Sequence, residues 1–153
     1  MTVHRLRPSP SYNPWADLAT NWPDVSVVLE PMSGTLLGEL RYPVIALRAG
    51  TSAAQRRCTL AHEIVHLERG VDDCGPWADR EELMIEREVA HRLIPLPRLI
   101  AAIQALGGRE DHAALAAALD VDHLILHTRL DGLSRAERQH IRDSLSTDLW
   151  SVA

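Results

Sequence analysis

The chain contains two kinds of hydrophobic pattern, one after the other. Between residues 25 and 48, apolar residues form three short runs, at 25–30, 36–41 and 44–48, with turn-forming residues between them. Short apolar runs separated by Gly, Ser and Pro are typical of β-strands joined by turns. This part of the chain therefore predicts a small antiparallel sheet.

Helical periodicity appears before the predicted sheet and again after it. Residues 13–22 predict a short helix with Asn13 as its N-cap. After the sheet, Ser52 and Gln55 have the spacing of a capping box at the start of a longer helix, which is expected over residues 53–69. A glycine directly after this segment is a typical helix end.

The rest of the chain is predicted to be helical. One helix is expected over about residues 80–94, before a segment with two prolines. Residues 99–149 are rich in Ala and Leu and are interrupted at Gly107-Gly108 and near Gly132. A helix, a small sheet and then several helices indicate an α+β fold.

The composition narrows the class of protein. With 153 residues, 46% of them apolar, the chain suits one domain with a hydrophobic core. A net charge of −5 without a basic block disfavours binding to nucleic-acid phosphates. Two cysteines are too few for a disulfide framework and fit a reducing cytosol. We see no signal peptide and no run of the ~20 apolar residues that a membrane span needs, so a cytoplasmic protein is expected.

The segment LAHEIVHLE, residues 60–68, contains the motif His-Glu-x-x-His. Residues four apart share one face of a helix, so His62 and His66 would present both imidazoles to one point. Two histidines and a carboxylate are a typical ligand set for zinc with an open position for water. Glu63 would be turned about 100° away, beside the metal, where a carboxylate can accept a proton from that water. Zinc is the default metal for these ligands, although manganese or iron can occupy a similar site.

The next predicted helix contains candidates for the third ligand. Ile85, Val89 and Leu93 recur every four residues and mark its core-facing stripe. Glu82 and Glu86 lie on or beside this stripe, and a buried carboxylate needs a partner or a metal. Glu82 is preferred as the ligand, and Glu86 is the alternative third ligand or a hydrogen-bond acceptor for a ligand imidazole. In a competing interpretation, both glutamates pair with nearby arginines at the edge of the stripe.

These residues carry a resemblance to a known family. RRCTLAHEIVHLE followed by EELMIEREVAHRLIP resembles the ImmA/IrrE family of zinc metallopeptidases, over about residues 25–99. That family pairs a Thr-x-x-His-Glu-x-x-His helix with a second helix of the form Glu-x-x-Ala-Asn/Asp before a proline. Counting back from Pro95 aligns Glu82 with the family's glutamate, which supports it as the third ligand. Ile85 and Glu86 depart from the family's Ala and Asn/Asp.

The resemblance implies both a fold and a function. The fold would be a small sheet packed on a zincin-like HExxH helix, followed by an all-helical C-terminal part. Residues 1–153 would form one metallopeptidase domain, with a catalytic core at about 13–98 and a helical subregion at 99–153. Family members are cytoplasmic peptidases that commonly accompany phages, mobile elements or stress responses, and several cleave a helix-turn-helix repressor. We therefore expect a zinc-dependent endopeptidase that acts on a regulatory protein.

Other polar residues give weaker signals. The candidate donors to the oxygen of a reacting carbonyl are Tyr42, His91, His123 and His127. Spacing places none of them, and a structural role is favoured for each. Cys58 lies one helical turn before the motif and is interpreted as a core residue, whereas Cys74 lies in a predicted loop.

Residues 115–133 have the sequence pattern of a helix-turn-helix, with a helix of small residues, a turn and a second helix. A DNA-binding module would need basic residues on its second helix, where only Arg129 occurs. Direct nucleic-acid binding is therefore not expected, and a packing or partner-docking element is favoured.

The alternative to a peptidase is a non-catalytic regulator, or a protein- or DNA-binding module, that retains the metallopeptidase fold. Glu63 favours the enzyme, because a structural metal site needs no general base and is normally closed by four protein ligands.

Overall fold

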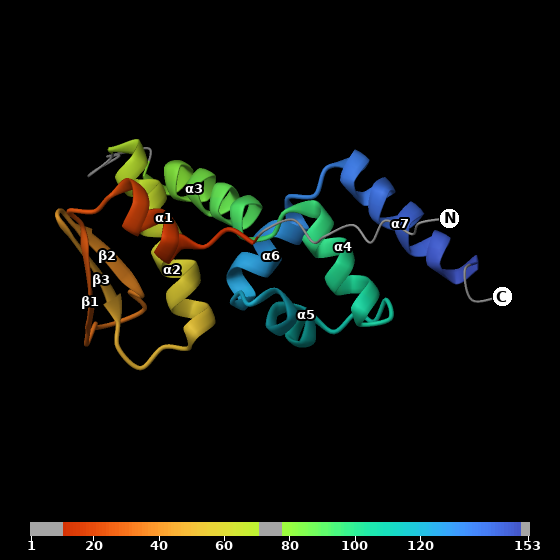
Figure 1. Ribbon diagram of the computed structural model, residues 1–153, viewed down its shortest axis with the longest axis horizontal. Helices are drawn as coiled ribbons and strands as arrows, with labels where there is room; N and C mark the ends of the chain where they lie inside the picture. The colour runs from red at the N-terminus through yellow and green to blue at the C-terminus, as the bar shows by residue number, and fades with distance from the viewer. Residues whose placement is uncertain (1–10, 71–77, 151–153) are drawn as a thin grey trace.

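Helix α2 lies between a small sheet and a group of helices in the computed structural model, which describes residues 11–70 and 78–150 (Figure 1). The N-terminal elements are α1 (Pro14–Asn21), β1 (Ser26–Glu30), β2 (Gly38–Arg41), β3 (Val44–Arg48) and α2 (Ala53–Arg69). The helices that follow are α3 (Ala78–Leu93), α4 (Leu96–Ala105), α5 (His112–Leu119), α6 (His123–Asp131) and α7 (Arg135–Trp150). The predicted α+β class with an all-helical C-terminal part is confirmed.

The sheet is mixed, and the expectation of an antiparallel sheet is wrong for one of its two pairings. Its strand order is β1-β3-β2; β2 pairs antiparallel with β3, whereas β1 pairs parallel with β3. The central strand is β3, the most apolar of the three, in which Ile45, Ala46 and Leu47 are fully buried. Strands buried on both faces are continuous apolar runs, and such a run gains most burial between two neighbours. The edge strand β2 is left beside α2.

Local capping signals fix the ends of the first two helices. The Asn13 side chain accepts hydrogen bonds at the start of α1. At the start of α2, Ser52 and Gln55 form the complete capping box, and Gly70 ends the helix in the left-handed conformation. The predicted bounds of α2, residues 53–69, are confirmed. These caps hold the HExxH segment in regular helix, which is the condition for presenting its histidines on one face.

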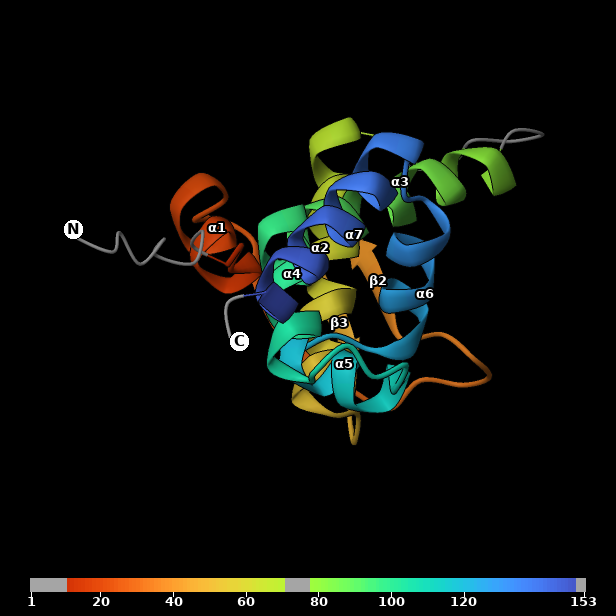
Figure 2. The same ribbon diagram turned by 90° about the vertical axis from the view of Figure 1, so that its right-hand side faces the viewer.

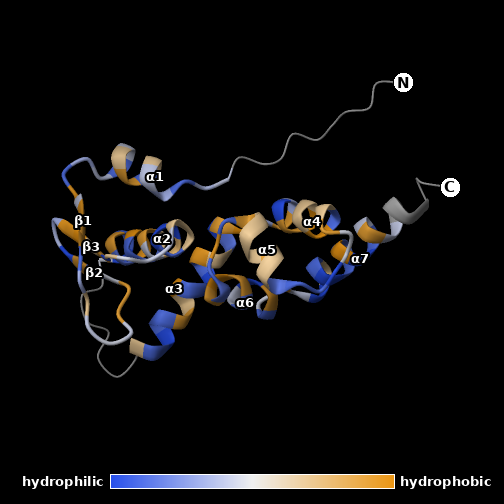
Figure 3. Ribbon diagram, turned by 90° about the horizontal axis from the view of Figure 1, so that it is seen from below, coloured by the Kyte–Doolittle hydropathy of each residue, from blue (hydrophilic) through white to orange (hydrophobic). Residues whose placement is uncertain are grey.

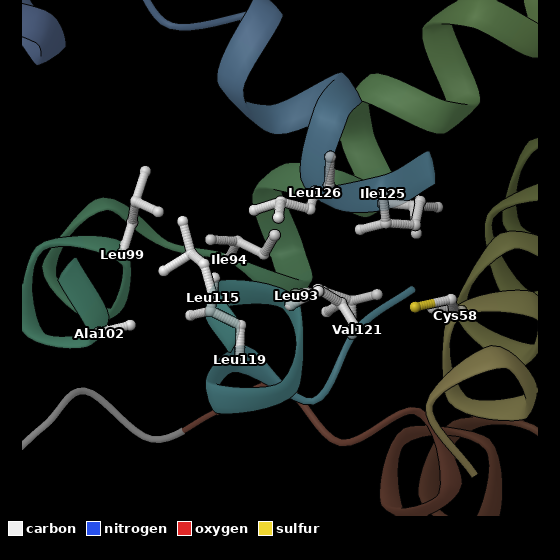
Figure 4. Close-up of a cluster of buried hydrophobic side chains, with 14 of the residues drawn as sticks. Cys58, Leu93, Ile94, Leu99, Ala102, Leu115, Leu119, Val121, Ile125 and Leu126 are labelled. Atoms are coloured by element: carbon white, nitrogen blue, oxygen red, sulfur yellow. The ribbon is translucent and has the colours of Figure 1, made fainter. Parts of the chain in front are cut away.

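Two hydrophobic clusters pack on opposite sides of α2. Ile64 of α2 belongs to a cluster with α1 and the sheet, whereas the neighbouring Val65 belongs to a larger cluster with α3 to α6. Figure 4 shows part of the larger cluster, where Cys58 of α2 points toward Val121 and Leu93. Both Ile64 and Val65 are completely buried. Helix α2 is therefore common to both cores.

The helices after α3 pack among themselves and against α3. Helix α6 lies alongside α3 (Figure 2), with Leu126 and Arg129 turned into the core. The predicted packing role of the α5–α6 pair is confirmed, whereas its role as a docking surface for a partner stays a prediction. Hydrophobic residues are frequent on α4 to α6, whereas the beginning of α3 is hydrophilic (Figure 3). Within the described ranges, no helix is both long and apolar enough to cross a membrane.

Candidate metal centre

The two histidines of the HExxH motif meet on one face of α2. The Nε2 atoms of His62 and His66 are 3.0 Å apart. Both side chains are only partly shielded, with 23% and 17% of their surfaces exposed. They therefore lie at the surface of the core and remain reachable from solvent, as a site that admits a substrate requires.

Helix α3 brings Glu82 onto the same point. Its Oε2 atom lies 3.1 Å from Nε2 of His62, and its Oε1 atom lies 3.0 Å from Nε2 of His66. Among the described residues, these three form the group whose ligand atoms lie close enough together to hold one metal ion. The structure thus brings Glu82, rather than Glu86, to the two histidines.

Other acidic residues of α3 have different surroundings. Glu81 and Glu88 both form ion pairs with Arg69 at the end of α2. These ion pairs hold α3 against α2 and so position Glu82. Glu86 lies one turn beyond Glu82 and lines a neighbouring cavity. In the described part of the chain, no hydrogen bond joins Glu86 to a ligand imidazole. The alternative that both glutamates pair with arginines is wrong, because Glu82 lies against His62 and His66 instead.

Glu63 lies beside the three candidate ligands and faces the sheet. Only 6% of the residue is exposed. Burial raises the pKa of its carboxyl group to about 7, the charges of Glu82 and Glu39 act in the same direction, and a backbone hydrogen bond from Leu40 opposes them. A buried carboxyl group with its pKa near neutrality can both accept and release a proton.

The electrostatics of the histidines suit metal ligation. Burial is the largest cause that lowers the pKa of His62, followed by the charge of His66, while Glu82 acts in the opposite direction. A lowered pKa favours the neutral imidazole, which is the form that binds a metal.

Gly38 allows strand β2 to approach this part of α2. A Cβ atom at Gly38 would lie 2.4 Å from Cγ2 of Thr59 and 3.0 Å from Oε1 of Glu63. Because Gly38 has no side chain, β2 can lie directly against Glu63, the candidate catalytic base. A cavity of about 340 Å³ opens between the two elements, and its lining includes all three candidate ligands and Glu63.

The donor set fits a zinc ion. Two imidazole nitrogens and a carboxylate are a typical three-ligand set for catalytic zinc. Ligand atoms about 2.0–2.1 Å from a tetrahedral zinc lie about 3.3 Å from one another, close to the 3.0 and 3.1 Å found between the ligand atoms here. Zinc would therefore need only small side-chain adjustments, and its binding by these residues stays a prediction.

The structure leaves the candidate carbonyl-oxygen donors outside the site, whereas Cys58 borders the larger cavity beside it. None of the four candidate carbonyl-oxygen donors lines either of the two cavities that contain His62 and Glu63. Tyr42 is 68% exposed in the turn before β3, and His127 instead contacts the ring of His112. Cys58 is a core residue whose Sγ accepts a hydrogen bond from the backbone of Asp122, and burial raises the pKa of its thiol to about 12. Cys74 lies outside the described residues.

Three residues near the site were missed by the sequence reasoning. Gly38 gave a weak signal, because an isolated glycine in a strand often marks a close backbone approach. Leu36 and Asp122 line the larger cavity next to the motif and gave none. Asp122 is sixty residues from His62 in the chain; the packing of α6 on α3 and the hydrogen bond from its backbone to Cys58 of α2 bring it to the site.

Comparison with family models gives the class of protein. Residues 23–131, more than two thirds of the chain, match the Peptidase_M78 model, described as the IrrE N-terminal-like domain. The chain belongs to this family, the ImmA/IrrE family, and has its metallopeptidase type of fold. Comparison with curated proteins and comparison with solved structures each found no match.

Proposed function

We propose that this protein is a zinc-dependent endopeptidase with His62, His66 and Glu82 as metal ligands and Glu63 as catalytic base. The convergence of the two imidazoles and the Glu82 carboxylate is the observation that carries the proposal. The buried Glu63 beside them favours an enzyme over a non-catalytic regulator, because a structural metal site needs no general base.

The residues of the site have separate tasks. Zinc, when bound, would polarise the scissile carbonyl and lower the pKa of a water molecule to about 7. Glu63 accepts a proton from the attacking water, whose oxygen bonds to the carbonyl carbon, and passes that proton to the amine nitrogen as the C–N bond breaks. Its carboxyl group is buried and hydrogen-bonded to the backbone of Leu40, which holds it in position for both transfers.

The substrate would bind as an extended segment beside β2. This strand is at the edge of the sheet and borders the cavity that contains the three candidate ligands. An edge strand presents backbone groups with which an extended peptide can pair. Such pairing would hold a peptide bond close to Glu63 without requiring a particular side chain.

The substrate class follows from the family resemblance. We infer that the protein cleaves a regulatory protein in the cytoplasm, and that this protein is a helix-turn-helix transcriptional repressor, as for several family members associated with phages or mobile elements. A requirement for an unfolded or exposed segment of the repressor would be consistent with binding beside β2.

Metal analysis is the experiment that tests the proposal. We expect about one zinc per chain in the purified protein after zinc loading and removal of excess metal. Glu82→Ala and His62→Ala should lose this zinc, and Glu86→Ala, one turn away on the same helix, serves as the matched control that should retain it. Elemental analysis with circular dichroism separates loss of metal from loss of fold.

Two results would contradict the proposal in different ways. Retention of zinc by Glu82→Ala together with its loss from Glu86→Ala would exchange the roles of the two glutamates. A folded wild-type protein that binds no metal even after zinc addition would exclude the peptidase mechanism and favour the non-catalytic regulator.

A further inference from the structure

The larger of the two cavities at the site extends away from the metal centre toward α6. It measures about 580 Å³, within the range of roughly 300–1,000 Å³ typical of ligand pockets. Its lining includes His62 and Glu63. A substrate whose scissile bond lies at Glu63 therefore has a neighbouring side chain at the mouth of this cavity.

The walls of the cavity are mainly apolar. Leu36 and Leu37, from the segment before β2, contribute to one side, and Leu124 and Ile125 of α6 contribute to the other. Leu36 and Leu124 are about half exposed. Exposed leucines on both sides of an opening provide contacts for the aliphatic part of a long side chain.

Besides Glu63, which is the candidate base, two further carboxyl groups line the cavity and make it acidic. Glu86 of α3 and Asp122 at the start of α6 both line it, and no arginine does. In the part of the chain that the structure describes, neither carboxylate forms an ion pair with an arginine, and His123 is the basic neighbour that interacts electrostatically with Asp122. Glu86 and Asp122 interact with each other electrostatically. Asp122 is held in place because its Oδ1 atom accepts a hydrogen bond of 2.9 Å from the backbone of Ile125.

We propose that this cavity is the specificity pocket of the enzyme and that it receives an arginine or lysine side chain of the substrate next to the scissile bond. The inference rests on the proposed endopeptidase function. The apolar walls would contact the aliphatic stem, and Glu86 and Asp122 would bind the cationic end. Two acidic residues alone would not define a site; here they line a cavity that shares His62 and Glu63 with the metal centre.

A neutral or acidic side chain fits the cavity less well. A hydrocarbon side chain would remove water from the two carboxylates and offer no hydrogen-bond donor in return, which is costly. An acidic side chain would bring another negative charge next to Glu86 and Asp122, which repel it. A guanidinium or ammonium group supplies several donors and the opposite charge.

Binding of small fragments tests the charge preference without requiring catalysis. The probes are n-butylguanidinium and its neutral isostere n-butylurea, titrated into the metal-free full-length protein while amide signals are followed by NMR. We expect butylguanidinium to shift the signals of Gly38, Leu124 and Ile125 and to bind about tenfold more tightly than butylurea. The same titrations after zinc loading should give the same order.

Variants that keep the fold test the two carboxylates. The double variant Glu86→Gln/Asp122→Asn keeps the shape of both side chains, and asparagine remains a good helix N-cap. It should bind butylguanidinium no better than butylurea. The matched control is Asp111→Asn, because Asp111 caps α5 through an equivalent 2.9 Å hydrogen bond to Ala114 but lies outside the cavity. Equal binding of both fragments by the wild type, or unchanged butylguanidinium binding by the double variant, would overturn the inference.

A cleavage assay separates this inference from the proposed function. The zinc-loaded enzyme is incubated with a proteome-derived peptide library cut after glutamate, so that arginine and lysine remain within the peptides. Cut sites should be enriched in basic residues on one side of the scissile bond, and the enrichment should disappear in the double variant. Cleavage without basic preference would overturn the specificity pocket and leave the endopeptidase in place. Selective butylguanidinium binding with no cleavage would contradict the endopeptidase and leave a cation-binding cavity without a role in specificity.

Discussion

Glu63 is the residue on which the distinction between an enzyme and a binding module depends. Its replacement by glutamine keeps the size of the side chain but removes its ability to accept a proton. We expect Glu63→Gln to retain zinc and the fold while cleavage falls by about 10³-fold or more. The measurement is the rate of peptide hydrolysis, with the zinc content of the same sample as the control. Full activity of this variant would exclude Glu63 as the base.

Gly38 is the residue whose replacement tests the close approach of β2 to α2. A Cβ atom there would overlap Cγ2 of Thr59 at 2.4 Å, so Gly38→Ala should lower the free energy of unfolding by about 1–3 kcal/mol. Thr59→Ser removes Cγ2 but keeps a hydroxyl group for the 2.8 Å hydrogen bond to the backbone of Gln55.

A double-mutant cycle by urea denaturation measures this coupling. The combined variant Gly38→Ala/Thr59→Ser should recover much of the stability that Gly38→Ala loses, because the serine leaves room for the new methyl group. Thr59→Ser alone is the control. Strictly additive effects of the two substitutions would show that the clash is relieved elsewhere.

The local part of the site could be predicted from the sequence, whereas its surroundings could not. The positions of His62, Glu63 and His66 relative to one another follow from helical geometry alone. Placing Glu82 needed the core-facing stripe of the next helix and the family pattern, because the two helices are joined by a segment without periodicity. Asp122 and the cavity depend on how α6 packs against α3, about which the sequence near His62 contains no information.

At the scale of elements, helix ends were predictable and strand partners were not. The capping box and the glycine define α2 through interactions within a few residues. The parallel pairing of β1 with β3 depends on which strand takes the centre of the sheet. That choice is made by burial of the whole strand against α1 and α2, so the turn signals around β2 were not sufficient to predict it.

Helices α6 and α7 are joined by an ion pair between a buried arginine and a partly exposed glutamate. The chain contains no lysine. Arginine, whose planar guanidinium group has several N–H donors, connects the two helices. Arg129 donates from its Nε atom to the carbonyl of Ile94 at 2.8 Å and from a terminal nitrogen to Glu137 at 2.6 Å. Its side chain is 1% exposed. Loss of Glu137 would leave a buried charge without its partner, which is destabilising.

The pKa of Glu137 gives this ion pair a defined pH dependence. The hydrogen bond from Arg129, followed by one from the backbone of Ser134, lowers that pKa from 4.5 to about 2. Because the folded-state pKa is the lower one, the stabilisation is complete above pH 4.5 and is lost as the pH falls from 4.5 toward 2. Glu137→Gln should therefore reduce the free energy of unfolding at pH 7 by about 1–2 kcal/mol.

Urea denaturation at pH 7 and pH 3 measures this prediction. The difference in free energy of unfolding between wild type and Glu137→Gln should be smaller at pH 3, where the ion pair contributes less to the stability of the wild type. Glu30→Gln is the control, because Glu30 forms an exposed ion pair with Arg41 and such pairs contribute little. A difference between wild type and Glu137→Gln that is the same at both pH values would contradict the assigned pKa.

At the scale of the whole molecule, α2 determines whether the chain behaves as one domain. The larger hydrophobic cluster contains residues on both sides of the expected boundary at residue 98, such as Leu93 and Leu119. The smaller cluster joins the sheet and α1 to the other face of α2. Unfolding either cluster would expose one buried face of the same helix. We therefore expect the sheet and the C-terminal helices to unfold cooperatively.

One conservative substitution in each cluster tests this cooperativity. Ile45 in β3 is completely buried in the smaller cluster, and Ile125 in α6 is 4% exposed in the larger one. Ile45→Val and Ile125→Val should each cost about 0.5–1.5 kcal/mol. Native-state hydrogen exchange should show that each variant lowers the protection of the slowest amides in both β3 and α6 by the same free energy, because these amides exchange only on global unfolding. Lower protection confined to the element that carries the substitution would mean that α2 separates two independently unfolding units, with the metal centre at their junction.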